Sequence, residues 1–118
     1  MKANTNPDTS PLRRASAPNP ASLAEVRELV RASFWYAADA FRYGGQRENA
    51  AAELEALAEE LALAGPDIAR ENPDAGLALA AISRAAFDAR DAMRDRKLSG
   101  DGCQAALDAM RALFSRLS

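Results

Sequence analysis

Residues 34–43 hold most of the aromatic side chains of this chain in one short stretch. Five of the seven aromatic residues fall there: Phe34, Trp35, Tyr36, Phe41 and Tyr43. Bulky apolar side chains are sparser elsewhere, so this stretch supplies the largest concentrated hydrophobic surface that folding must bury. A helix through it carries apolar side chains on more than one side and therefore needs more than one neighbour.

The composition around this stretch favours helices and leaves little material for strands. Of the 118 residues, 29 are Ala, which has the highest helix propensity and lets helices approach closely. Val, Ile and Thr contribute two residues each and never stand in a run. The sequence therefore predicts an all-α fold, a small antiparallel helical bundle of about four helices joined by short connections.

Capping residues and helix breakers delimit the first two expected helices. Ser22 with Glu25 has the form of a capping box, which begins the first helix. Gly44-Gly45 ends that helix, because Gly adopts the left-handed cap conformation without strain. Gly65-Pro66 is expected to stop the second helix, since Pro cannot continue the hydrogen-bond ladder. The predicted ranges are 23–43 and 46–64.

Similar signals delimit the second half of the chain. Asn72 is a good N-cap, and Pro73 suits the first helical position that follows it. Asp101 with Gln104 repeats the capping-box spacing ahead of the last helix. The predicted ranges are 73–97 and 102–117.

The first twenty residues differ from the rest of the chain in composition. They hold four of the six Pro, with Asn, Thr and Ser between them. Such a segment buries too little apolar surface to offset the entropy of ordering it. We expect a disordered N-terminal tail over residues 1–20, followed by a single helical bundle domain over residues 21–118.

The ionisable residues argue against several classes of function. Fifteen basic and 17 acidic residues give a formal net charge of −2, which offers no electrostatic reason to bind nucleic acid or an anionic membrane. The chain has no His, so it lacks the commonest general base and the usual partner of Ser and Cys nucleophiles. We therefore expect no enzymatic activity, no catalytic residues, no cofactor and no metal site.

Two features that could carry chemistry are interpreted as structural. Glu55 and Glu59 lie one helical turn apart, but di-iron bundles also require Glu-x-x-His pairs, so the two form a solvated acidic face. Cys103 shares an apolar stripe with Leu107 and Met110, which indicates a small core residue. A single Cys cannot form an internal disulfide, and it fits a reducing, cytoplasmic location.

The second apolar face of helix 23–43 is the feature that departs from an ordinary monomer. Leu29, Tyr36 and Tyr43 recur every seven residues, roughly opposite the stripe that contains Phe34. Trp35 points in a third direction among charged neighbours. Aromatic residues are enriched at the centres of protein interfaces, so Leu29, Trp35, Tyr36 and Tyr43 form the candidate interface. The alternative is that one four-helix core buries both faces, with Trp35 at its edge.

These observations favour an interaction role. The leading hypothesis is a small helical protein-interaction module, a homodimer that acts as an adaptor, a regulator or a secretion-chaperone-like protein. The alternative is a helical bundle that binds an apolar small-molecule ligand between its helices. Under the leading hypothesis the partner is a protein, including a second copy of the chain.

Overall fold

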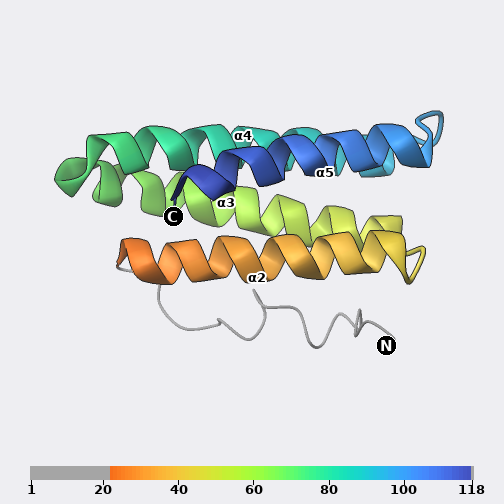
Figure 1. Ribbon diagram of the computed structural model, residues 1–118, viewed down its shortest axis with the longest axis horizontal. Coiled ribbons are helices and arrows are strands. Elements are labelled where there is room, and N and C mark those ends of the chain that lie inside the picture. Colours follow the sequence, from red (N-terminus) through yellow and green to blue (C-terminus); the bar gives the residue numbers. More distant parts are fainter. Residues whose placement is uncertain (1–21, 118) are drawn as a thin grey trace.

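Four α-helices account for nearly all of residues 22–117, the part of the chain that the computed structural model describes. They are α2 (Leu23–Arg42), α3 (Arg47–Glu71), α4 (Pro73–Arg94) and α5 (Gly100–Phe114), and a short 3-10 helix, η2 (Ser115–Leu117), follows α5. The helices lie side by side along the long axis of the molecule, and consecutive helices run in opposite directions (Figure 1). The prediction of a small all-α bundle is confirmed. The predicted tail, residues 1–20, lies outside the described residues.

Helix α2 begins and ends close to where its caps predict. The Ser22 hydroxyl oxygen accepts the Glu25 backbone amide at 3.2 Å, which satisfies one amide of the first turn. The helix ends at Arg42, one residue before the predicted end. Gly45 in the following turn has a φ of +61°, a left-handed conformation that suits Gly because it has no Cβ.

Helix α3 does not stop at Gly65-Pro66, so the predicted end at residue 64 is wrong. The helix continues to Glu71, with Pro66 inside it. Pro66 is exposed, so the carbonyl that loses its amide partner lies at the surface rather than in the core. Continuing the helix also buries Ile68, which packs into the core. This tertiary contact outweighs the local preference for a break.

Helix α4 differs from its predicted range at its C-terminal end, and helix α5 differs at both ends, because it starts at Gly100 and gives way at Phe114 to the 3-10 helix η2. Asn72 caps α4 as expected, and its side-chain oxygen accepts the Ala75 amide at 3.1 Å. The helix ends at Arg94 rather than at residue 97. Helix α5 starts at Gly100, because Ser99 is its N-cap and accepts the Gly102 amide at 3.2 Å. The predicted capping role of Asp101 is therefore wrong.

The central pair of the bundle is α3 with α4, which touch each other more extensively than any other two helices. Their backbones approach closely at Gly76, where an added Cβ would clash with the Ala69 Cβ and would lie 2.9 Å from the Ala69 Cα. The buried hydroxyl of Ser83 donates to the Ala58 carbonyl oxygen at 2.8 Å and joins the same two helices. Because α2 packs on α3 and α5 packs on α4, the order around the bundle is α2, α3, α4, α5.

Small and medium-sized apolar side chains fill the space between the helices. The largest fully buried ones are Phe34, Leu54, Leu57, Leu61, Leu79, Ile82, Leu107 and Met110. Each of the four helices contributes to this single cluster. The bundle closes least tightly between α2 and α5, which touch far less than the other neighbouring pairs. This seam and the opposite α3–α4 edge hold the surfaces described next.

Candidate interaction surfaces

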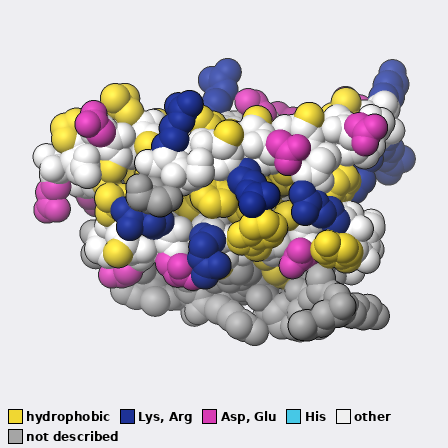
Figure 2. Space-filling view, in the orientation of Figure 1, with side chains coloured by type: hydrophobic (Ala, Val, Ile, Leu, Met, Phe, Trp, Pro, Cys, Tyr) yellow, Lys and Arg dark blue, Asp and Glu magenta, His cyan; other side chains and the backbone are white. Residues whose placement is uncertain are grey.

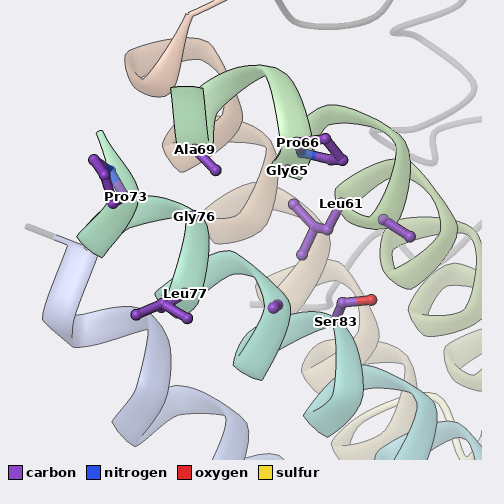
Figure 3. Close-up of a pocket in the computed structure, with 10 residues that line it drawn as sticks. Leu61, Gly65, Pro66, Ala69, Pro73, Gly76, Leu77 and Ser83 are labelled. Atoms are coloured by element: carbon purple, nitrogen blue, oxygen red, sulfur yellow. The ribbon is translucent and has the colours of Figure 1, made fainter. Parts of the chain in front are cut away.

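An apolar groove lies between the C-terminal half of α3 and the N-terminal half of α4. Its volume is about 600 Å³, and no charged side chain lines it. The lining residues, termed the α3–α4 groove below, are Leu61, Ala62, Gly65, Pro66, Ala69, Pro73, Gly76, Leu77, Ala80 and Ser83. Most of them are small, so they leave a hollow between two helices that cross closely at Gly76. In Figure 3, Ala69 of α3 is directed toward Gly76 of α4 at this crossing.

Two features distinguish the α3–α4 groove from ordinary protein surface. Leu77 lines it and is 73% exposed, the largest exposed fraction of any large hydrophobic residue in the described part of the chain. Pro66 has no amide, so the carbonyl of Ala62 four residues earlier lacks its helical donor. The groove therefore combines an unusually exposed apolar side chain with the position where Pro66 interrupts the hydrogen-bond ladder of α3.

The four predicted interface residues differ in burial and in the contacts that they make within the chain. Tyr36 is buried, at 8% exposure, and its hydroxyl oxygen accepts a hydrogen bond from the Asn49 side chain of α3 at 3.0 Å. Leu29 is half-buried and packs against the core. Tyr43 is 69% exposed at the end of α2, and half-buried Trp35 faces α5 instead. Contacts within the chain thus account for much of the second apolar face of α2.

Trp35 belongs to a surface that we term the α2–α5 seam, where the edges of these two helices face each other. The Arg111 guanidinium of α5 lies over the Trp35 ring, 5.1 Å from its centroid, and the Phe34 ring packs edge-on beneath at 5.2 Å. Further along, Arg42 Nε donates to Gln104 Oε1 at 3.0 Å. Figure 2 shows basic and hydrophobic side chains interspersed along this seam, with acidic side chains gathered toward its outer edges.

Arg47 is a structural residue that sequence reasoning missed. It lies at the start of α3, and its guanidinium donates to four backbone carbonyl oxygens where α4 ends and the next turn begins. These are the oxygens of Ala92, Met93, Asp95 and Leu98, at 2.9 to 3.3 Å. A cation at a helix C-terminus also complements the negative end of the helix dipole. Arg47 thus caps α4 from the neighbouring helix.

An ion-pair network ties the same end of α3 to α4. Arg94 contacts Glu48 and Glu55, each at 2.9 Å, and Arg90 contacts Glu55 at 3.0 Å. The predicted acidic face of α3 is therefore partly neutralised by α4, and Glu59 is not part of this network. Hydrogen bonds from Arg94 first, and then from Arg90, hold the pKa of Glu55 below its ordinary value.

This network predicts a specific dependence of stability on pH. The pKa of Glu55 is lower in the folded state than in the unfolded state. Glu55 therefore makes its full contribution to the free energy of unfolding above its unfolded pKa of about 4.3, and this contribution is lost as the pH falls through its folded pKa. Glu55→Gln should lower the free energy of unfolding at neutral pH. Below about pH 4.3, the free energy of unfolding of this variant should fall less steeply with pH than that of the wild type. Urea denaturation at a series of pH values measures both effects. The control, Glu59→Gln, should retain the wild-type slope, and equal slopes for all three proteins would contradict the assignment.

The remaining candidates for chemistry are accounted for by packing. Cys103 is buried and its thiol lies 3.3 Å from the Ala92 carbonyl oxygen.

Between residues 22 and 117, no three His, Cys, Asp or Glu side chains come together in a group that could hold a metal ion. In the same range, no helix is both long enough and apolar enough to span a lipid bilayer.

Comparison of the chain with protein-family models, with curated proteins and with solved structures found no match in any of the three.

Proposed function

We propose that this protein is a non-catalytic protein-interaction module that forms a homodimer through the α3–α4 groove. The observation that carries the proposal is an uncharged groove of about 600 Å³ with the 73% exposed Leu77 at its edge. Exposed apolar surface of this kind marks interaction sites on proteins that are otherwise well covered.

A second copy suits the groove because the same surface carries both a projecting side chain and a hollow. The hollow is lined mainly by Ala, Gly and Pro, and Leu77 stands beside it. In a two-fold interface each patch meets its own copy, so the Leu77 of each chain can enter the groove of the other. The absence of charged lining residues removes any like-charge repulsion at the centre of such an interface.

This proposal moves the self-contact away from the residues that the sequence suggested. Tyr36 already packs within the monomer, so it would have to leave its Asn49 hydrogen bond to reach another chain. Leu77 has no such competing contact with the core. The α3–α4 groove is therefore the better candidate for dimerisation than the set Leu29, Trp35, Tyr36 and Tyr43.

Substituting Leu77 tests the proposal. Leu77→Asp should convert a dimer into a monomer, because each interface would then bury two carboxylates without partners. Light scattering over a range of protein concentrations measures the solution mass. The matched control is Leu63→Asp, which places the same charge on a residue that is 63% exposed but does not line the groove. It should remain dimeric.

Two outcomes would contradict the proposal. One is a wild-type protein that stays monomeric at every concentration. The other is a dimer that Leu63→Asp disrupts as strongly as Leu77→Asp does. Because Leu77 and Leu63 are both exposed, circular dichroism should show wild-type helicity for the two variants, so that a change in mass reports assembly rather than unfolding.

The second candidate function is binding of an apolar small molecule in the same groove. Its volume falls within the range of about 300–1,000 Å³ that is usual for small-molecule sites. Large apolar side chains between the helices, such as Phe34 and Met110, are fully buried in the core, so the groove is the site considered for a ligand. A thermal-shift screen of fatty acids and aromatic compounds tests this candidate, and stabilisation that Leu77→Asp abolishes without any change in solution mass would favour it.

The interaction module is proposed to work as an adaptor or regulator in the cytoplasm. A cytoplasmic location fits the buried thiol of Cys103, the only cysteine in the chain. Dimerisation through the α3–α4 groove leaves the α2–α5 seam on the opposite side of each bundle. An adaptor needs such a second surface.

A further inference from the structure

The α2–α5 seam carries arginines whose charges are not neutralised within the described part of the chain. Arg27, Arg42 and Arg111 form no ion pair with any residue from 22 to 117. By contrast, two carboxylates near the seam are already engaged. Glu28 pairs with Arg31 and Asp108 accepts a hydrogen bond from Gln104. Asp108 keeps its charge, because Gln104 is a neutral donor, so the seam presents three arginines that lack a carboxylate partner among residues 22–117.

The Arg111 guanidinium is held in position but its donors are not used. It lies over the Trp35 ring, and it makes no hydrogen bond within residues 22–117. A guanidinium lying against an aromatic face keeps its N–H groups directed along its edge, where they can bind a carboxylate through two parallel hydrogen bonds. Arg42 uses only Nε for Gln104, so its two terminal nitrogens also remain available.

The spacing of these cations matches the period of a helix laid along the seam. Trp35, which lies under Arg111, is seven residues before Arg42, or about 10 Å along α2. Arg27 is eight residues before Trp35, or about 12 Å. Both intervals correspond to about two helical turns, so carboxylates two turns apart on one face of a helix would meet the cations in sequence.

We propose that the α2–α5 seam binds an acidic amphipathic helix of a partner protein. Its carboxylates would pair with Arg111, Arg42 and Arg27, and its apolar residues would cover the half-buried rings of Trp35 and Phe41. The seam lies across the bundle from the α3–α4 groove, so this proposal stands whether or not the protein dimerises there.

Other anionic partners fit the seam less well. Nucleic-acid surfaces concentrate many cations, whereas this seam offers three, of which Arg27 and Arg42 lie about 22 Å apart along α2 and Arg111 belongs to α5. The whole chain also carries a net charge of −2. The chain's own first 21 residues contain Lys2, Arg13 and Arg14 against a single Asp8, so their charge does not complement a basic seam. An acidic protein segment is the partner that the charges favour.

A direct binding experiment tests the proposal. The full-length protein is titrated with a synthetic helical peptide that carries glutamates two turns apart on one face and leucines between them. Calorimetry measures the affinity, and the fluorescence of Trp35, the only Trp in the chain, reports whether the seam is occupied. We expect saturable binding, a shift in Trp35 emission, and weaker binding at higher salt concentration.

Matched variants locate the binding surface. Arg111→Gln should weaken binding by about tenfold or more, because the peptide carboxylate loses a charged hydrogen-bond donor. Arg84→Gln removes one exposed charge from α4, away from the seam, and should leave the affinity unchanged. The monomeric Leu77→Asp variant should bind as tightly per chain as wild type does, which separates this proposal from that of dimerisation.

Several results would overturn the proposal. These are no saturable binding, equal binding of a peptide with glutamine in place of glutamate, and equal weakening by Arg84→Gln. Binding of a single-stranded oligonucleotide or of anionic lipid vesicles in preference to the peptide would assign the seam to a different class of partner. Because Arg111 is exposed, wild-type helicity of Arg111→Gln excludes unfolding as the cause of weaker binding.

Discussion

Arg47→Met should lower the free energy of unfolding by about 3 kcal/mol. The substitution keeps most of the aliphatic side chain but removes the guanidinium that donates to four carbonyl oxygens at the end of α4. Hydrogen bonds from charged donors contribute about 1.5–3 kcal/mol each, and their effects at one group are not additive. Urea denaturation followed by circular dichroism, at one protein concentration, measures the change.

Two further variants separate the capping role from charge alone. Arg47→Lys should recover only part of the loss, because a single ammonium group cannot reach all four oxygens at once. Arg70→Met removes an exposed Arg from the other end of α3, where Asp67 is its one ion-pair partner among residues 22–117, and should change the stability by less than about 1 kcal/mol. A full recovery by Lys would mean that the helix dipole, rather than the guanidinium geometry, accounts for the stabilisation.

Gly76→Ala should destabilise the protein by about 2 kcal/mol, although Ala is the better helix former. The added Cβ would lie 2.9 Å from the Ala69 Cα, well inside the usual separation of carbon atoms, so α3 and α4 must move apart. Thermal and urea denaturation both report the change. The loss arises from the helix crossing itself, because the contact involves backbone that cannot rotate away.

The same substitution at Gly65 is the matched control. A Cβ there would meet nothing within 4 Å, so Gly65→Ala should stabilise α3 by about 0.5–1 kcal/mol. The substitution Ala69→Gly removes the Ala69 Cβ, which is the atom nearest to the added Cβ. Combining it with Gly76→Ala in a double-mutant cycle should therefore recover part of the lost stability. Independent, additive effects of the two substitutions would show that Gly76 and Ala69 are not coupled.

Local signals in the sequence were sufficient for the fold class and for the first residues of α2 and α4. The Ser22 and Asn72 caps predict the starts of two helices, because a capping side chain acts within its own first turn. Gly65-Pro66 led to a wrong prediction for the end of α3, because that end depends on contacts outside its own turn. Continuation of α3 depends on the burial of Ile68 and the crossing at Gly76, and both involve residues that propensity does not consider.

The candidate surfaces were less accessible to sequence reasoning. The aromatic cluster drew attention to Trp35, which does lie on the α2–α5 seam, but periodicity could not show that Tyr36 would bond to Asn49 within the chain. The α3–α4 groove consists mainly of Ala, Gly and Pro, and such residues give no hydrophobic signal individually. The sequence did offer one clue to Arg47. A cation in the first turn of a helix interacts unfavourably with the positive end of that helix's dipole, which suggests that its guanidinium binds another part of the chain.

The loose contact between α2 and α5 also bears on how the chain reaches its folded state. The other main contacts join helices that follow one another in sequence, so only short loops must close before the α3–α4 pair and its two flanking helices begin to pack. The α2–α5 seam instead joins the two ends of the described chain, and its closure costs the most entropy for the fewest contacts. We therefore expect the surface that carries Trp35 and Arg111 to assemble last, on a bundle that is already largely formed.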